Sequence, residues 1–554
     1  MKRVCAIGLD AATLDIIRPL VAEGRLPAFQ RLMAQGAWGP LASTIHPLSP
    51  PAWSSFITGK NPGKHGIYDF VVHKPGSYEL LYTYGGMRRG DSLWRILSAA
   101  GKRVVVANVP MTYPPEEVNG VLISGFDAPG VNSGFIHPPE LLGEIEARLG
   151  KYQLRDYPQG ETPESFLAQI NRLFDFQAAL ADYLMKSQQW DLFIIVFTLL
   201  DHVQHAYWQY TDPRFTQISE EERRRFGTAI RDMYIRVDEL LGRILEKMSG
   251  QANIAVFSDH GAGPCLKAVF VNKWLEERGY LAYANGGGSL RLLKAAHYRL
   301  KNLVPWWGLE LLKRMLPGLR QKVKSKLVFS EIDWSRTRVF AFGRESTNLF
   351  VNLAGKFPEG IVAEEDYEDV LEQVSRDLLA LRDPETGEPA VARVWRRDDV
   401  YHGECLDSAP DLLVEWRGHQ YTSWPGYDDR NRNIFESSLK HSDYSDWSQL
   451  QKGGNHRPNG IVFLAGEGVR PGLALEGARI IDMAPTLLYW LDVPVPEDMD
   501  GRVLKAAFEQ DYLSRRPPRQ GRAADSGARE RRDIYTEEQS RAIEERLRGL
   551  GYID

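Results

Sequence analysis

The sequence predicts an α/β fold in which a mostly parallel central sheet is flanked by helices. Continuous apolar runs rich in Val, Ile and Phe are typical of strands buried on both faces of such a sheet. Three of these runs, within residues 2–10, 191–201 and 253–260, lead into an acidic residue. Segments with a helical pattern, such as 139–149 and 164–185, alternate with the strand-like runs, and this alternation predicts βαβ units.

Further strand-like runs follow along the chain, and we expect them around the same sheet. The segment 367–395 is expected to pack a helix and another strand beside the core, and we find no internal repeat. The further runs cover residues 103–110, 120–126, 338–343, 348–353, 411–416 and 460–466.

The composition is typical of a globular enzyme. The 554 residues are 43% hydrophobic and include 14 Trp, 23 Tyr and 22 Phe, so the chain can bury a large core and is expected to exceed one compact domain. The formal net charge of -5 neither favours nor excludes an anionic partner. Cys5, Cys265 and Cys405 are few, odd in number and widely separated, so they predict neither a disulfide framework nor a cysteine metal site.

The start of the chain is interpreted as a strand and not as a signal peptide, because an acid follows the short basic and apolar segment. No uninterrupted apolar run of about 18 residues occurs, which argues against a membrane span. We therefore expect a cytoplasmic protein.

Composition and pattern divide the chain into five expected segments. The last of them, an amphipathic helix that begins near Thr536, would pack on its own core or join subunits in a homo-oligomer. The segments are the first part of the core at 1–280, a basic helical cap insertion at 281–335, the second part of the core at 336–508, a flexible linker at 509–535 and the C-terminal helix at 536–554.

The expected cap is strongly basic. Residues 290–328 hold ten Lys or Arg and one acid, Glu310, with apolar residues between them, as in a basic amphipathic helical insert. The insert would be a solvated excursion whose apolar face packs on the core, a lid over an anionic substrate, or a peripheral contact with a membrane surface. No further motif supports nucleic-acid binding.

Acidic residues lie where three of the predicted strands end. These residues are Asp10, Asp201 and Asp259. Because ligands of parallel sheets bind outside the carboxyl ends of the strands, we expect the three carboxylates to meet at one edge of the sheet.

Histidines accompany these acids at spacings that suit a shared site. His205 follows Asp201 by four residues in a helical pattern, which places both on one helix face. His260 directly follows Asp259, and His456 lies in a Gly-rich turn before the strand-like run at 460–466. Nitrogen and oxygen ligands suit Zn²⁺ and also allow Mn²⁺. Together the residues could hold two divalent ions.

Ser49 lies at a predicted helix start, where it could meet a phosphoryl group. It precedes Pro50 and Pro51, a start signal for a helix, and a helix N-terminus favours a phosphoryl group. The prolines have no N–H, so the backbone of Ala52 and Trp53 would offer the first donors.

Each feature also has a structural interpretation. An Asp at a strand end is usually a cap or turn residue, the pair Asp201 and His205 could cap a helix, and His65 is expected to hold its own loop and is left out of the site. The functional interpretation depends on the occurrence of all seven residues in one chain.

The chain resembles the type I phosphodiesterase and nucleotide pyrophosphatase branch of the alkaline phosphatase superfamily, in scattered blocks over about the first 505 residues. The order of the blocks is more specific than any single block. The matching positions are Ser49, Pro51, Thr58, Gly59, Pro62, His65, Gly66 and Ile67 in the nucleophile motif, Asp201 and His205, Ser258 to Gly261, Gly454 to His456, and Asp482 to Gly501.

This resemblance implies an alkaline phosphatase-like fold and two metal sites. One ion would bind Asp201, His205 and His456, and the other would bind Asp10, Asp259, His260 and Ser49. Ser49 would attack phosphorus in line to form a phosphoserine, which water then hydrolyses.

The chain departs from the family at one position. Family nucleotide phosphodiesterases commonly have an Asn shortly after the His-Gly-Ile motif, where this chain has Tyr68, Asp69 and Phe70. The phosphate oxygen that this Asn would bind needs another donor, such as a backbone N–H, Lys60 or Lys64. No sulfatase motif is present. The chain also has no match to the Arg and the third-metal acids of monoester-specific alkaline phosphatases.

The sequence thus predicts a metal-dependent phosphohydrolase that cleaves a phosphodiester or pyrophosphate in a small phosphorylated substrate, nucleotide-like or other. A phosphomutase or phosphomonoesterase of the same superfamily is the first alternative, and a catalytically silent binding protein is the second.

Overall fold

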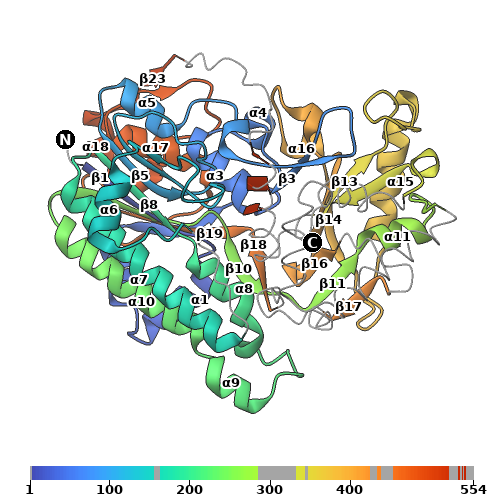
Figure 1. Ribbon diagram of the computed structural model, residues 1–554, viewed down its shortest axis with the longest axis horizontal. Coiled ribbons are helices and arrows are strands. Elements are labelled where there is room, and N and C mark those ends of the chain that lie inside the picture. Colours follow the sequence, from blue (N-terminus) through green and yellow to red (C-terminus); the bar gives the residue numbers. More distant parts are fainter. Residues whose placement is uncertain are drawn as a thin grey trace.

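The computed structural model describes residues 3–154, 162–284, 332–342, 347–424, 433–437 and 453–522, together with six positions between 535 and 543. Its fold is α/β, as the sequence predicts, with a large mixed sheet flanked by helices (Figure 1). The two faces of the sheet are covered by different helices: α7 (Pro163–Ser187) and α10 (Ala229–Met248) lie on one side, and α3 (Ser49–Thr58), α5 (Leu93–Ala99) and α17 (Met483–Trp490) on the other.

The centre of this sheet is parallel, and β19 and β7 run in the opposite direction on either side of it. Strands β9, β1, β8, β5 and β6 run parallel, whereas β19 pairs antiparallel with β9 and β2, and β7 pairs antiparallel with β6. The strands in spatial order are β20 (Leu473–Ala474), β2 (Ala37–Ala42), β19 (Asn459–Ala465), β9 (Ala252–Phe257), β1 (Arg3–Leu9), β8 (Leu192–Phe197), β5 (Val104–Val109), β6 (Gly120–Ser124) and β7 (Ile136–His137), with β21 (Ala478–Arg479) beside β2.

Local sequence signals start several flanking helices. Thr162 caps α7 by accepting a hydrogen bond from the N–H of Ser165, and Ser219 caps α9 in the same way through Glu222. The helices are α1 (Leu14–Ala22), α2 (Pro27–Gln35), α3 (Ser49–Thr58), α4 (Pro62–His65), α5 (Leu93–Ala99), α6 (Leu141–Leu149), α7 (Pro163–Ser187), α8 (Leu199–Thr211), α9 (Glu220–Phe226), α10 (Ala229–Met248), α17 (Met483–Trp490) and α18 (Gln510–Arg515).

A second lobe lies beside the central sheet; we define it as the described residues within 267–437. Its four-stranded antiparallel sheet has the order β12-β13-β15-β14, and a smaller sheet has the order β16-β11-β17. The elements are β11 (Lys267–Phe270), α11 (Val271–Glu277), β12 (Val339–Phe342), β13 (Thr347–Val351), α15 (Tyr367–Leu379), β14 (Val391–Arg396), α16 (Arg397–Val400), β15 (Leu412–Trp416), β16 (Tyr421–Trp424) and β17 (Phe435–Ser437).

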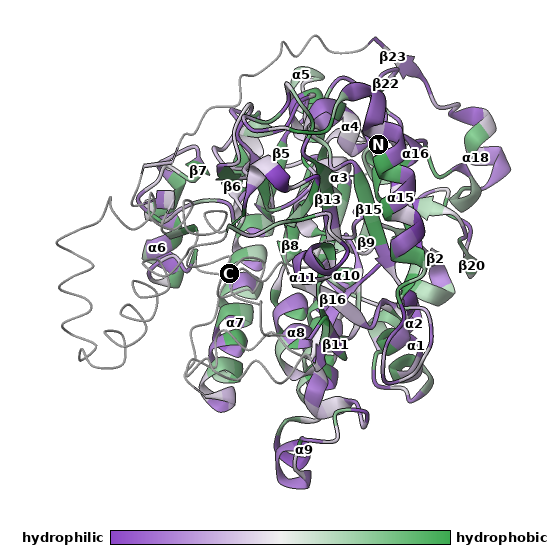
Figure 2. Cartoon of the chain, turned by 90° about the vertical axis from the view of Figure 1, so that its right-hand side faces the viewer, coloured by the Kyte–Doolittle hydropathy of each residue, from purple (hydrophilic) through white to green (hydrophobic). Residues whose placement is uncertain are grey.

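The second lobe has its own hydrophobic core, which includes Trp274, Phe340 and Val374. The strand-like runs at 338–343, 348–353 and 411–416 therefore contribute strands to a separate antiparallel sheet and not to the central sheet around which we expected them. Buried strands of both sheets are hydrophobic in Figure 2, whereas the surface of α15 is hydrophilic. Hydrophobicity shows that a strand is buried but not which sheet it joins.

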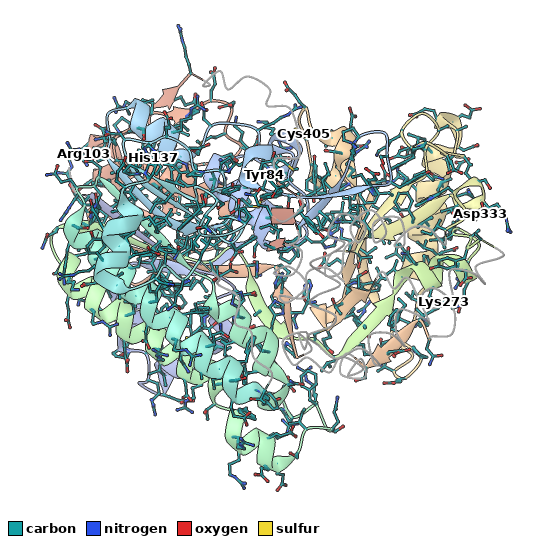
Figure 3. The ribbon with its side chains drawn as sticks, viewed as in Figure 1. Tyr84, Arg103, His137, Lys273, Asp333 and Cys405 are labelled. Atoms are coloured by element: carbon teal, nitrogen blue, oxygen red, sulfur yellow. The ribbon has the colours of Figure 1, made fainter. Side chains whose placement is uncertain are left out.

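The two lobes are joined by a small hydrophobic cluster and by polar contacts. Tyr68 from the first lobe packs on Tyr401 with their ring centroids 5.1 Å apart, and Leu413 joins the same cluster. The Tyr68 hydroxyl donates to the carbonyl of Cys405 at 2.9 Å. Figure 3 shows that the outer parts of the two lobes lie at opposite ends of the molecule. Arg103 and His137 are at the end of the first lobe, and Lys273 and Asp333 are at the end of the second.

The expected cap and tail fall largely outside the described residues. This applies to residues 285–331 of the cap, 523–534 of the linker and most of the predicted C-terminal helix, so the predicted domain boundaries stay predictions. Tyr535 is described, and its ring packs on Tyr84 and Tyr113 of the core. Among the described helices, none is both long and apolar enough to cross a membrane.

Candidate active site

Three acidic side chains meet at the carboxyl edge of the central sheet, as predicted from their positions after strands. Asp10 directly follows β1, Asp259 lies just after β9, and Asp201 is in the first turn of α8, which follows β8. Strand β1 pairs in parallel with both β8 and β9, so the three strands end side by side. All three carboxylates are at least 97% buried.

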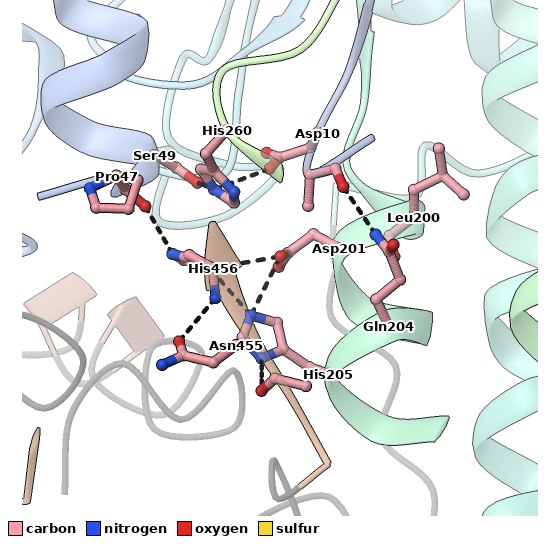
Figure 4. Close-up of polar contacts among 12 residues, drawn as sticks. Asp10, Pro47, Ser49, Leu200, Asp201, Gln204, His205, His260, Asn455 and His456 are labelled. Atoms are coloured by element: carbon pink, nitrogen blue, oxygen red, sulfur yellow. Dashed lines mark hydrogen bonds and ion pairs between the residues drawn. The ribbon is translucent and has the colours of Figure 1, made fainter. Parts of the chain in front are cut away.

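The three predicted histidines join these acids (Figure 4). His205 lies one turn after Asp201 on α8, with its Nε2 3.1 Å from Asp201 Oδ1. His456 lies on β18 (Gly454–Arg457), which pairs antiparallel with β10 (Gly261–Pro264), the strand that follows His260. The Nε2 atom of His456 is 3.0 Å from that of His205, and the rings of His260 and His456 stack at 3.8 Å.

Backbone carbonyls orient all three imidazoles. The Nδ1 atoms lie 3.0 Å from the oxygen of Gly454 for His205, 3.0 Å from that of Gly261 for His260, and 2.9 Å from that of Pro47 for His456. A carbonyl only accepts hydrogen bonds, so each Nδ1 carries a proton and each Nε2 faces the acids. This is the arrangement of metal-binding histidines in proteins.

The charges of the site are those of a centre built for cations. Burial and the charges of Asp259 and Asp201 raise the pKa of Asp10 well above its usual value, and burial raises the pKa of Asp259. Burial also opposes the charge on Asp201, but His205 and His456 outweigh it and hold the pKa of that carboxyl well below its usual value. A divalent ion would offset the repulsion among these carboxylates.

Two groups of ligand atoms have the spacing of metal sites. Asp201, His205 and His456 form one group, and Asp10, Asp201 and His260 form the other, with the ligand atoms of each group within 4.8 Å of one another. Asp201 thus lies in both groups, whereas the family resemblance assigns it to one. The buried oxygens Asp10 Oδ1 and Asp259 Oδ2 have no hydrogen-bond partner among the described residues, so an ion has acceptors to bind.

Ser49 lies beside the second group. It is the first residue of α3, is almost fully buried, and its Oγ is 3.3 Å from Nε2 of His260. Pro50 and Pro51 follow it in the first turn, as the sequence predicts. The seven predicted residues therefore form one constellation, although 407 positions separate Ser49 from His456.

The three residues predicted to bind substrate have protein partners. The N–H of Ala52 donates to the carbonyl of Leu48 at 3.0 Å. Lys60 is paired with Asp498, and Lys64 donates to Asp500 Oδ1 at 2.6 Å. The contact of these three groups with substrate stays a prediction.

Comparison with known proteins decides the family of this chain. The profile of the type I phosphodiesterase/nucleotide pyrophosphatase family matches residues 4–436. The chain belongs to this family. It is therefore a hydrolase of phosphoester bonds, in agreement with the class that the sequence predicts. A comparison with curated protein sequences gives no match.

Solved structures agree with the fold. Phosphonoacetate hydrolase from Sinorhizobium meliloti in complex with phosphonoacetate has 15% sequence identity and a TM-score of 0.53, over 89% of this chain and 96% of that chain. Human ectonucleotide pyrophosphatase/phosphodiesterase 5 has 11% identity and a TM-score of 0.47, over 92% of this chain and 100% of its own. At such identities, the likeness to the hydrolase shows a shared fold.

Asp69, one of the residues in the place where the family resemblance led us to expect an Asn, contacts the second lobe. Asp69 Oδ2 accepts a hydrogen bond at 2.9 Å from the amide of Asn348, a residue of the second lobe, and Asp69 Oδ1 accepts from the N–H of Phe70 at 2.6 Å. His65, which we left out of the site, binds Ser55 at 2.9 Å through Nε2, and its Nδ1 accepts from the N–H of Ile67 at 3.2 Å. Burial lowers the pKa of His65 to about 3, which is consistent with a structural role.

Sequence reasoning missed two residues that support the site. Ser258 Oγ donates to the carbonyl of His260 at 2.6 Å and accepts from the N–H of Ala12 at 3.0 Å. The amide of Gln204 donates to the carbonyl of Ala11 at 3.0 Å, and thereby holds the turn that follows Asp10. Ser258 lies within the motif that precedes His260, but Gln204 has no sequence signal beyond its place between two ligands.

A cavity of about 290 Å³ opens beside the ligands, and the sequence did not predict it. One wall is the segment 42–48, which leads into Ser49, together with His456. The opposite wall belongs to the second lobe and includes Trp395 and Trp416. These two tryptophans come from neighbouring strands, β14 and β15, and only the packing of the second lobe on the first brings them to the site.

Proposed function

We propose that this enzyme uses two divalent metal ions to cleave a phosphodiester or pyrophosphate bond through a phosphoserine on Ser49. The observation that supports the proposal is the convergence of three imidazole Nε2 atoms and three buried carboxylates beside the hydroxyl of Ser49. Such nitrogen and oxygen donors suit Zn²⁺, and Mn²⁺ is the alternative ion.

The chain's own residues divide between the two ions. Asp201, His205 and His456 would hold one, and Asp10, Asp259, His260 and Ser49 would hold the other, with Asp201 close to both. Bound there, paired divalent ions neutralise charge on phosphoryl oxygens and favour the ionised form of a hydroxyl nucleophile.

Ser49 gives up its hydroxyl proton, and its Oγ forms the new bond to phosphorus while the bond to the leaving oxygen breaks. The electron pair departs with the leaving oxygen, which takes up a proton from solvent. The position of Ser49 at the start of α3 adds the partial positive charge of a helix N-terminus near the phosphoryl group. A water molecule then attacks phosphorus, the bond to Oγ breaks, and Ser49 takes a proton back.

Substitution of the nucleophile tests this proposal. We expect the activity of metal-loaded Ser49→Ala toward bis-p-nitrophenyl phosphate to be at least about a thousandfold lower than that of wild type, while its metal content stays the same. Ser54→Ala is the matched control, because it removes a buried hydroxyl from the same helix, and its activity should stay close to wild type. In wild type, acid quenching during turnover should trap phosphate on the peptide that contains Ser49.

Other outcomes would point to the alternatives. Faster turnover of p-nitrophenyl phosphate than of the diester would favour a phosphomonoesterase. Return of the phosphoryl group from Ser49 to product alcohol, and not to water, would favour a phosphomutase. No turnover of diester, pyrophosphate or monoester by the metal-loaded wild type would refute the proposal and favour a silent binding protein.

A further inference from the structure

The cavity beside the ligands has an aromatic wall whose side chains are held firmly in place. The indole N–H of Trp395 donates to Glu415 Oε2 at 3.1 Å, and that of Trp416 donates to Thr347 Oγ1 at 2.9 Å. The hydroxyl of Tyr421, a third aromatic lining residue, donates to Asp383 Oδ2 at 2.8 Å. Because the polar end of each side chain has a protein partner, the wall offers the cavity mainly ring surface.

The cavity adjoins the site of the chemistry through His456 and the segment before Ser49. Pro47 and Leu48, which immediately precede Ser49, line it, and so does His456, whose Nε2 is part of the ligand cluster. A phosphoryl group bound at Ser49 would therefore place an attached organic group within reach of the aromatic wall. A cavity of about 150 Å³ is enough to hold benzene, so the 290 Å³ present here has room for an aromatic group.

The charge of the lining selects against a second anion. The described lining residues include no Lys or Arg, and the acid among them is Glu415. Burial lowers the pKa of the lining residue His46 to about 4, and burial also lowers that of His419, so neither ring supplies a positive charge at neutral pH. A carboxylate or a second phosphate in this cavity would lose hydration and meet Glu415 as the charged lining residue. The neighbouring guanidinium groups are already engaged, because Arg393 stacks on the Trp395 ring and Arg457 donates to the backbone carbonyls of His456 and Pro264.

We propose that this cavity, the aromatic pocket, binds an uncharged aromatic group that is esterified to the phosphoryl group of the substrate. The proposal rests on the proposed function, because the phosphoryl group is placed at Ser49 and the ligand cluster. It adds a substrate class to that function: aryl phosphoesters without a further anionic group on the aromatic portion.

Three phosphonates test the pocket without any chemical step. Methylphosphonate, phenylphosphonate and 4-carboxyphenylphosphonate share the group that binds the metal centre and differ only in the group that enters the pocket. By isothermal titration calorimetry on the metal-loaded protein, we expect phenylphosphonate to bind about tenfold more tightly than methylphosphonate. 4-Carboxyphenylphosphonate should bind no more tightly than methylphosphonate.

Two variants assign the effect to the pocket. Trp395→Ala should reduce the advantage of phenylphosphonate over methylphosphonate to less than about threefold. Glu415→Gln keeps an acceptor for the Trp395 N–H but removes the negative charge. The affinity for 4-carboxyphenylphosphonate should therefore rise relative to that for phenylphosphonate. Trp38→Ala, a half-buried tryptophan on β2 that does not line the pocket, is the control and should keep the wild-type ratios.

The outcomes separate the pocket from the reaction. Equal affinity for methylphosphonate and phenylphosphonate would refute the proposed role of the pocket, even if the enzyme turns over diesters normally. Equal affinity for the phenyl and carboxyphenyl compounds would also refute it. An unchanged ratio in a folded Trp395→Ala would do the same, and if that variant does not fold, Glu415→Gln decides the point. Absence of binding by all three phosphonates together with absence of turnover would instead refute the proposed function.

Discussion

The Nε2 atoms of His205 and His456 lie 3.0 Å apart although 251 positions separate the two residues. Both rings use Nδ1 to bind a backbone carbonyl, so the two Nε2 atoms face each other and Asp201 Oδ1. Burial lowers the pKa of His456 to about 3, so this ring is uncharged at neutral pH. A metal ion bound between the two rings and Asp201 would pair with all three atoms.

Loss of one of these nitrogens should remove one ion. We expect His456→Ala to bind about one divalent ion per chain where wild type binds about two, and to lose at least about a hundredfold of its activity. Metal content is measured by mass spectrometry after gel filtration. His402→Ala, whose side chain is 66% exposed and bound to Asp500, is the control and should keep both ions. Equal metal content in His456→Ala and wild type would contradict the assignment.

Metal removal should destabilise the fold. An ion present at 100 times its Kd contributes about 2.7 kcal/mol, and its loss leaves the buried carboxylates to repel one another. We expect EDTA to lower the melting temperature by several degrees, as followed by circular dichroism, and added Zn²⁺ to restore it. EDTA already saturated with Zn²⁺ is the control. If neither EDTA nor added Zn²⁺ changes the melting temperature, these side chains do not bind metal.

The stability of the metal-free protein should depend on pH through Asp10. The raised pKa of Asp10 means that the folded state holds this proton more tightly than the unfolded state does. As pH rises from about 4 through the folded pKa, the unfolded state loses its proton first, and the free energy of unfolding falls. Asp201, with a lowered pKa, contributes in the opposite direction.

Comparison with Asp10→Asn isolates this contribution. In EDTA, the variant should show a flatter decline in the free energy of unfolding between about pH 4 and 8, measured by urea denaturation. Parallel pH profiles for the variant and wild type would mean that Asp10 is not protonated in the folded metal-free protein.

The tail contact at Tyr535 should contribute to stability. Its ring packs on those of Tyr84 and Tyr113, with centroids 5.3 and 5.9 Å away, and its hydroxyl donates to the carbonyl of Asp127 at 2.8 Å. We expect Tyr535→Ala to lower the free energy of unfolding by about 2 to 4 kcal/mol and Tyr535→Phe by about 1 kcal/mol. Urea denaturation measures both, and equal losses in the two variants would show that the ring stacking adds nothing.

Much of the site was predictable because its ligands follow local signals. Asp10 and Asp259 come after continuous apolar runs, and buried parallel strands of that kind must end at a common edge. The spacing of Asp201 and His205 is one helical turn, and the two prolines after Ser49 start a helix. Each of these inferences needs only neighbours within a few residues, and the order of the motifs along the chain supplied the family.

The second lobe, the partners of Lys60 and Lys64, and the aromatic pocket depend on contacts between distant segments. The apolar runs at 338–343, 348–353 and 411–416 can pair with a parallel or an antiparallel neighbour equally well, so their own residues do not determine which sheet they join. Lys64 lies 436 positions from the Asp500 that it binds, and Trp395 reaches the segment before Ser49 only when one lobe packs on the other. Local residues set the conformation of each segment, whereas the burial of hydrophobic surface across the whole chain decides which segments meet.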